Sequence, residues 1–101
     1  MVVITAGPIS EFAKVHPPSA SPLNDWFFKT KAANWSSFSE MKLTFNSVNN
    51  IGNDRFVFNV GGGNDILVVL IHFGIRTLYV RRVLTHNDYD ALTKAGSLNT
   101  L

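Results

Sequence analysis

The clearest strand pattern of the sequence is RFVFNVGGGNDILVVLIHFGIRTLYVRRVL, at residues 55–84. Every second residue at its start is a large apolar one, namely Phe56, Phe58 and Val60. A period of two is typical of a strand with one buried face, which predicts a strand at Arg55–Val60. The glycines of 61–65 predict a hairpin loop. The apolar run Ile66–Phe73 predicts a central strand that is covered on both faces.

Turn and cap residues in the flanking sequence predict the remaining elements. Gly74-Ile75 suits a two-residue turn of type II′, because glycine adopts the positive φ of its first position. The first half is predicted to hold an edge strand at Val2–Thr5 and a helix at Ile9–Val15 that is stopped by Pro17 and Pro18. Two further helices are predicted, one capped by Ser21 with Pro22 at its first position, and one begun by the capping box Ser37–Glu40. The second half adds a strand at Arg76–Leu84 and a last helix that is capped by Thr85 and ended by Gly96.

This order of elements predicts an α+β fold, with N-terminal helices packed on a twisted antiparallel sheet and a short C-terminal helix. The side chains of Phe56, Phe58 and Val60 are expected to face the helices. We expect residues 1–101 to form a single domain with one hydrophobic core. Residues 97–101 are expected to be a frayed tail.

The composition excludes several classes of protein. Hydrophobic residues make up 46% of the chain and charged residues 16%, which is typical of a globular protein. The absence of cysteine excludes disulfides, a thiol nucleophile and a cysteine-ligated zinc, and fits a reducing cytoplasm. Nothing in the first residues has the form of a signal peptide, and Ile66–Ile71 is too short to span a membrane. The three histidines are widely separated, so no metal site is predicted.

The candidate site lies where the last strand passes into the last helix. His86 falls in the first helical turn, whose backbone N–H groups suit a phosphate and disfavour a charged imidazole. Tyr89 shares a helix face with His86, and Tyr79 shares a strand face with Arg81. Arginine binds phosphate and an aromatic ring stacks on a base. Alternatively, these residues only cap, pack or form a solvated edge, and spacing alone favours this structural interpretation.

The chain resembles the HigB branch of the RelE-like toxins. The resemblance rests on four pieces in order, Asn53–Gly62, Ile71-His72-Phe73, Leu78–Arg81 and Thr85-His86-x-x-Tyr89-Asp90. It extends weakly upstream through His16-Pro17, Leu23 with Trp26, Trp35 with Phe38, and Lys42 with Phe45.

The resemblance implies a RelE-like fold, a helix-turn-helix antitoxin of the HigA type as partner, and cleavage of messenger RNA on the ribosome in the cytoplasm. It implies attack of the ribose 2′-OH on its own phosphate, without a metal or other cofactor. His86, Arg81 and Tyr89 match the base, the cation and the acid. The residues expected to bind RNA are Arg55, Asn59, Tyr79, Arg82 and Lys42.

One position departs from the family pattern. The family usually places an arginine in the strand after the hairpin glycines, where this chain has Ile66 and Leu67. Losing one such cation near the scissile phosphate lowers the cleavage rate by on the order of a hundredfold. The alternative function is therefore a weak or catalytically inactive toxin homologue that binds a protein or the ribosome. A third interpretation is an unrelated module that binds a small anion at the last helix.

Overall fold

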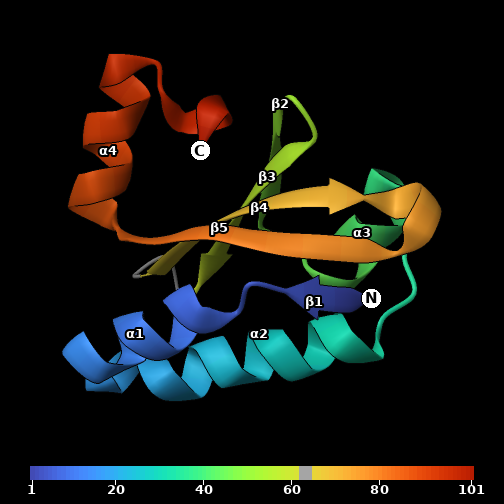
Figure 1. Cartoon of the computed structure of the whole chain (residues 1–101), viewed down its shortest axis with the longest axis horizontal. Helices are drawn as coiled ribbons and strands as arrows, with labels where there is room; N and C mark the ends of the chain where they lie inside the picture. The colour runs from blue at the N-terminus through green and yellow to red at the C-terminus, as the bar shows by residue number, and fades with distance from the viewer. Residues whose placement is uncertain (62–64) are drawn as a thin grey trace.

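The computed structural model describes residues 1–61 and 65–101, and it has the expected α+β architecture (Figure 1). The elements, in chain order, are β1 (Val2–Ile4), α1 (Gly7–Val15), α2 (Ala20–Ala32), α3 (Phe38–Thr44), β2 (Val48–Gly52), β3 (Arg55–Val60), β4 (Asp65–His72), β5 (Thr77–Thr85) and α4 (His86–Ala95), with short 3-10 turns at Pro17–Ser19, Phe73–Ile75 and Leu98–Thr100. Within the described ranges, no helix is long and apolar enough to cross a membrane.

The sheet has the order β1-β5-β4-β3-β2. Its strands β2 to β5 form the antiparallel meander, and Val60 lies opposite Asp65 where β3 and β4 are joined. The predicted loop between them falls mainly on residues 62–64, which lie outside the described residues. β1 pairs with β5 in parallel, with Val2 opposite Thr77, so the sheet is mixed rather than wholly antiparallel. The long helical connection after β1 makes this parallel pairing feasible.

β2 was not expected from the sequence. Its residues VNNIG include two asparagines and a glycine, which are depleted in strands. The strand forms at the sheet edge because β3 supplies a partner, with Val48 opposite Phe58. A register shift between Asn50 and Gly52 bends the strand where it turns back toward β3. Tertiary pairing therefore overrides a weak local preference.

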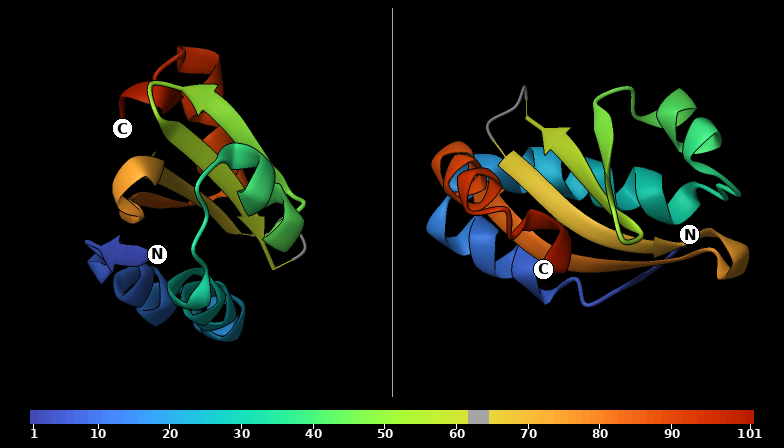
Figure 2. Two further views of the ribbon diagram at one scale, coloured as in Figure 1. Left: turned by 90° about the vertical axis from the view of Figure 1, so that its right-hand side faces the viewer. Right: turned by 90° about the horizontal axis from the view of Figure 1, so that it is seen from above.

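Apolar side chains form two clusters, one on each face of the sheet, rather than the single core expected. The first lies between the sheet and the layer of α1 and α2, and α3 also packs into it (Figure 2). The second lies on the opposite face, under α4 and the C-terminal turn, and its buried members are Val57, Ile66, Val68, Leu84 and Leu98. β4 supplies residues to both clusters, which explains its continuous apolar run.

The alternation of β3 is confirmed. Phe56, Phe58 and Val60 belong to the first cluster, whereas Val57 belongs to the second. Phe58 is 1% exposed and packs edge-on against the rings of Trp26 and Phe45, with ring centroids 5.3 and 5.4 Å apart. These aromatic contacts join β3 to α2 and to the end of α3.

Two local predictions were wrong in detail. α2 begins at Ala20, straight from the turn Pro17–Ser19 and without a side-chain cap, so Ser21 and Pro22 lie inside its first turn. The connection after β4 is a 3-10 turn at Phe73–Ile75. The residue that follows it, Arg76, has a positive φ of 51°, whereas Gly74 does not. The side chain of Arg76 donates to the carbonyl of Phe73 and so stabilises this left-handed residue.

The helix caps follow the sequence more closely. Ser37 Oγ accepts from the backbone N–H of Glu40 at 3.2 Å, but the Glu40 carboxylate bonds Ser36 instead of returning to Ser37. The hydroxyl and N–H of Ser36 hold the pKa of Glu40 below its ordinary value. Thr85 Oγ1 accepts from the N–H of Asp88 at 3.2 Å, and Gly96 ends α4 with φ 69°. Both ends of α4 are thus set by the predicted residues.

Residues 97–101, expected to be a frayed tail, pack against the second face of the sheet instead. Leu98 is 8% exposed and belongs to the second cluster. Asn53 Nδ2 donates to the carbonyl of Asn99 at 3.3 Å, which ties this segment to the turn between β2 and β3. An apolar surface left uncovered by α4 is the physical reason for this packing.

Candidate functional site

A β-bulge in β5 organises the arginines. Val68 lies opposite Arg82 and Val69 lies opposite Val80, so Arg81 is an additional residue in β5 without its own partner in the register. Val80 packs in the first cluster, whereas Arg82 pairs with Val68 of the second. Consecutive residues of a regular strand point to opposite faces. The bulge instead places Arg81 and Arg82 together on the α4 side of the sheet.

Arg55 and Arg81 converge on one oxygen atom. Arg55 donates from Nε and Nη2 to the main-chain oxygen of Leu101, at 3.3 and 3.2 Å. Arg81 donates from Nε to the same oxygen at 3.0 Å. The two side chains come from β3 and β5, with β4 between them. Side chains far apart in sequence therefore form one cationic pair on the second face of the sheet.

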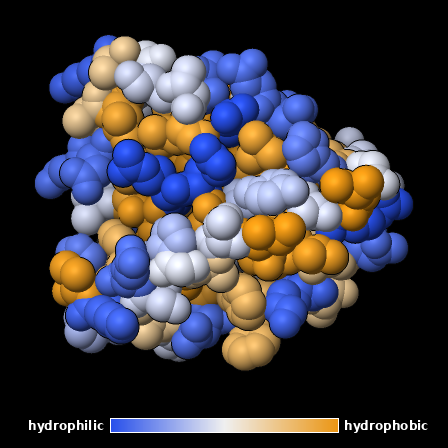
Figure 3. All heavy atoms as spheres, in the orientation of Figure 1, coloured by the Kyte–Doolittle hydropathy of each residue, from blue (hydrophilic) through white to orange (hydrophobic). Residues whose placement is uncertain are grey.

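The surface around this pair mixes charge with apolar side chains. Figure 3 shows strongly hydrophilic side chains gathered beside the C-terminal segment, among hydrophobic ones. Arg55 lies opposite Leu70, which lies opposite Tyr79 on the other side, so the three residues form a row across the sheet. Tyr79 is half-buried and contacts the exposed His72 ring edge-on at 6.1 Å between centroids. An aromatic ring thus lies on the same face as the arginine pair.

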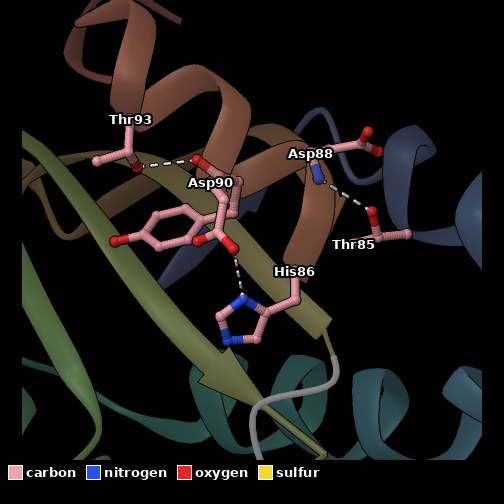
Figure 4. A network of polar contacts seen from close by, with 6 residues as sticks. Thr85, His86, Asp88, Asp90 and Thr93 are labelled. Carbon is pink, nitrogen blue, oxygen red and sulfur yellow. Dashed lines mark hydrogen bonds and ion pairs between the residues drawn. The ribbon is translucent and has the colours of Figure 1, made fainter.

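His86 and Asp90 form a second group at the start of α4. The Asp90 carboxylate lies 3.6 Å from His86 Nδ1, and both side chains are well exposed (Figure 4). The Thr85 cap begins the helix beside them. With Nδ1 facing Asp90, the other nitrogen Nε2 makes no polar contact with the part of the chain that the structure describes. The Asp90 carboxylate thus lies on the Nδ1 side of the exposed ring, and the other ring nitrogen is open for proton transfer.

Tyr89 links this group to the second cluster. Its ring lies edge-on to His86 at 6.2 Å between centroids and packs against the buried residues under α4. The i, i+3 and i, i+4 spacings place Tyr89 and Asp90 on the helix face of His86, as expected for an α-helix. The sequence predicted that Tyr89 shares a helix face with His86. It missed Asp90, although the i, i+4 spacing from His86 was the available signal.

The two groups share a face of the sheet but do not touch. Arg81 and Thr85 are separated by roughly 13 Å at about 3.3 Å per strand residue. Arg82 lies between them and lines a hollow of about 380 Å³ with Leu84 and Asp88. The other two candidate residues, Asn59 and Lys42, lie apart from the arginines.

Asn59 and Lys42 make other contacts. Asn59 lies opposite Ile66 in the register, and its Nδ2 donates to Ser47 Oγ at 3.1 Å. Lys42 lies on α3, where its ammonium sits 5.4 Å from the centroid of the Phe38 ring. Phe38 packs against the first cluster, so Lys42 belongs to the helix side of the sheet rather than to the α4 side.

The positions expected to carry an arginine in the family pattern are both 0% exposed. Ile66 packs in the second cluster under α4, and Leu67 packs in the first cluster with the N-terminal helices. A guanidinium at position 66 would extend along the α4 side, whereas one at position 67 would enter the helix-side core. Of the two, only position 66 lies on the face that carries Arg55, Arg81 and Arg82.

No group of three or more His, Cys, Asp or Glu side chains among residues 1–61 and 65–101 is arranged to hold a metal ion. The charged groups of the candidate site are the guanidinium groups, the Asp88 carboxylate that lines the hollow with Arg82, and the His86–Asp90 pair. Guanidinium groups bind phosphate oxygens in a planar, two-donor geometry, and an oriented imidazole can take a proton. This combination suits the chemistry of a phosphodiester.

Comparison with known proteins gives consistent results. A family model described as HigB_toxin, the RelE-like toxic component of a toxin–antitoxin system, matches residues 19–92. A protein named mRNA interferase HigB from Escherichia coli O6:H1 (strain CFT073) is 29% identical over 96 residues, covering 93% of each chain. The mRNA interferase toxin HigB of Escherichia coli strain K12 and the mRNA interferase HigB of Shigella flexneri are each 36% identical over 55 residues, covering 52% of this chain and 53% of theirs.

Proposed function

Because this chain belongs to the HigB family of RelE-like toxins, we propose that it cuts messenger RNA on the ribosome as the toxin of a toxin–antitoxin system. The observation that carries the proposal is the exposed His86 imidazole at the start of α4, with Nδ1 facing Asp90, on the face that carries the arginines. The proposed place of action is the cytoplasm, and the proposed partner is a helix-turn-helix antitoxin of the HigA type.

The reaction uses the substrate's own hydroxyl. His86 Nε2 takes the proton of the ribose 2′-OH, whose oxygen attacks the adjacent phosphorus. The bond between phosphorus and the 5′ oxygen breaks, and Tyr89 donates a proton to that leaving oxygen. Arg81 stabilises the negative charge that develops on the phosphorane. The products are an RNA end with a 2′,3′-cyclic phosphate and a second end with a free 5′-hydroxyl.

The ribosome has a defined part in this proposal. His86 and Arg81 are not in contact, so the chain alone does not hold a base and a cation around one phosphate. Binding on the ribosome would orient the RNA in line for attack, and orientation can lower a barrier by roughly 7 kcal/mol in good cases. Arg55, Arg82, Asn59 and Tyr79 are proposed to bind the RNA on either side of the cut, with Lys42 as a more distant contact.

Induction in a bacterium tests the proposal. The chain, expressed without an antitoxin, should slow growth and create new transcript 5′ ends. His86→Ala and Arg81→Ala should each relieve the growth defect while leaving the fold intact by circular dichroism. His16→Ala is the matched control, because His16 is also exposed but lies after α1, and it should remain toxic.

The second candidate function is a catalytically inactive homologue that binds an antitoxin-like protein or the ribosome. The burial of Ile66 and Leu67 favours it, because no arginine is supplied by β4. Under this alternative the chain is harmless at high expression, creates no new transcript ends, and still binds a helix-turn-helix protein encoded beside it. Gain of cutting by Ile66→Arg would support the inactive state of the natural chain.

A further inference from the structure

We propose that a pocket beside the turn between α1 and α2 binds one arginine side chain of a partner protein. The pocket has a volume of about 410 Å³, which lies in the range of roughly 300–1,000 Å³ for binding sites of small groups. It is found at the end of the sheet where the turn Pro17–Ser19, the junction of β3 with β4 and the start of α4 come together (Figure 1). Its lining includes none of the residues proposed to bind or cut RNA, so this proposal does not rest on the proposed function.

The first argument is a buried carboxylate without a cation. Asp65 lines the pocket and is only 4% exposed, and its Oδ1 accepts a hydrogen bond from Ser19 Oγ at 2.8 Å. A buried aspartate is rare unless it is paired, because an isolated charge loses its hydration. Among the described residues Asp65 forms no ion pair, and residues 62–64, Gly-Gly-Asn, carry no cationic side chain. A cation from another molecule would supply the positive charge that this chain does not.

The second argument is the nature of the walls, which decides the kind of cation. The apolar residues that line the pocket are Phe12, Val15, Pro17, Pro18 and Pro22. The ring of His16, which also lines it, lies against Phe12 with 4.5 Å between centroids and 33° between planes. A guanidinium group is planar, is more weakly hydrated than an ammonium group, stacks on rings and meets a carboxylate with two parallel N–H groups. The methylene stem of an arginine can lie along the prolines while its head reaches Asp65.

The third argument concerns the rim, which favours a protein over a free small molecule. Val15 ends α1 and is 73% exposed, although its side chain is aliphatic. Apolar surface around a polar anchor is typical of protein interfaces, and arginine is enriched among the residues that dominate their binding energy. A segment that inserts an arginine would cover Val15 with a neighbouring apolar side chain. Thr85 also lines the pocket, so the bound segment would lie against the start of α4.

Blocked amino acids test the pocket in the wild-type protein. N-acetyl-arginine amide is titrated into the isotope-labelled chain, and the backbone amide resonances are followed by NMR. N-acetyl-citrulline amide is the matched control ligand, because a neutral urea group replaces the guanidinium. The arginine probe should shift the resonances of Ser19 and Asp65 and bind about tenfold more tightly than the citrulline probe. Equal affinities, or no shift at these residues, would overturn the proposal.

A charge-removing variant locates the carboxylate that binds. Asp65→Asn keeps the shape and an oxygen acceptor for Ser19, and it should lower the affinity for the arginine probe to that for the citrulline probe. Asp25→Asn is the matched control, since Asp25 is an exposed carboxylate on α2, and it should bind like the wild type. An equal loss in both variants, or no loss in a folded Asp65→Asn, would contradict the assignment. If Asp65→Asn does not fold, the two probes still decide in the wild type.

Short peptides test whether the ligand belongs to a protein. Acetyl-Leu-Arg-Leu amide should bind several-fold more tightly than acetyl-Gly-Arg-Gly amide, because the leucines cover the apolar rim. Val15→Ser should remove this preference, whereas Leu43→Ser, at a position 88% exposed on α3, should keep it. A preference that survives Val15→Ser would refute the docking surface. Tighter binding of free arginine or of spermidine than of the leucine peptide would refute a protein partner.

Discussion

Phe58→Ala should lower the free energy of unfolding by about 5 kcal/mol, the upper end of the range of about 3–5 kcal/mol for a buried phenylalanine. The ring is 1% exposed and makes edge contacts with Trp26 and Phe45. Each such aromatic pair contributes about 0.5–1.5 kcal/mol beyond the area it buries. Both contacts are lost together, and no flexible side chain replaces them at the junction of β3, α2 and α3.

Urea unfolding, followed by tryptophan fluorescence and by far-ultraviolet circular dichroism, measures this loss. For a chain of this size, 1 kcal/mol shifts Tm by roughly 4–8 °C, so the expected fall in Tm is about 20–40 °C. Phe28→Ala is the matched control, because Phe28 is 68% exposed, and it should change stability by less than about 0.5 kcal/mol. A loss below about 2 kcal/mol for Phe58→Ala would refute the packing of β3 against the helices.

Three further predictions concern the caps and the β4 strand. Thr85→Ala should cost about 1 kcal/mol in urea unfolding, because the side-chain acceptor at the start of α4 is lost; no loss would exclude the cap. The hydrogen bonds from Ser36 lower the pKa of Glu40. The ionised Glu40 carboxylate therefore stabilises the fold fully above the ordinary Glu pKa, and this stabilisation is lost as pH falls through the lowered pKa. The stability difference between wild type and Glu40→Gln should therefore shrink on acidification, and a constant difference would contradict this. Leu67→Arg should destabilise the protein more than Ile66→Arg, because position 67 faces the helix-side core; thermal melts showing the reverse order would contradict the assignment of faces.

Much of the fold follows from local patterns in the sequence. The two-residue period of Arg55–Val60 and the continuous apolar run of β4 identified the central strands and their buried faces. Thr85 and Gly96 marked both ends of α4, because N-caps and C-terminal glycines act through bonds within a few residues. These features depend on neighbours in the chain, so they can be read without the tertiary structure.

Other features depend on contacts between distant segments. β2 forms because β3 offers an edge, despite a composition that disfavours strands. Residues 97–101 are ordered because the second face of the sheet leaves apolar surface to cover. The parallel pairing of β1 with β5 likewise requires two segments that are far apart in sequence. Local propensity carries no information on any of these.

The candidate site divides in the same way. The sequence supplied the candidate residues, and the helical spacing correctly placed Tyr89 beside His86. Strict alternation would put Arg82 on the face opposite Arg81, and the bulge in β5 reverses this. The spacing of Leu78, Val80 and Val83, which departs from a period of two, was the available sign of that bulge. The meeting of Arg55 with Arg81 at Leu101 had no local signal at all.

Cleavage of a defined messenger RNA in a reconstituted translation system tests the central claim most directly. The purified chain is added with and without ribosomes, and the RNA ends are analysed chemically. Cutting is expected only with ribosomes present, with a 2′,3′-cyclic phosphate on the upstream product. It should be lost in His86→Ala and proceed at the wild-type rate in His16→Ala. An intact messenger RNA in the presence of translating ribosomes and folded wild-type chain, or cutting that persists in His86→Ala, would contradict it.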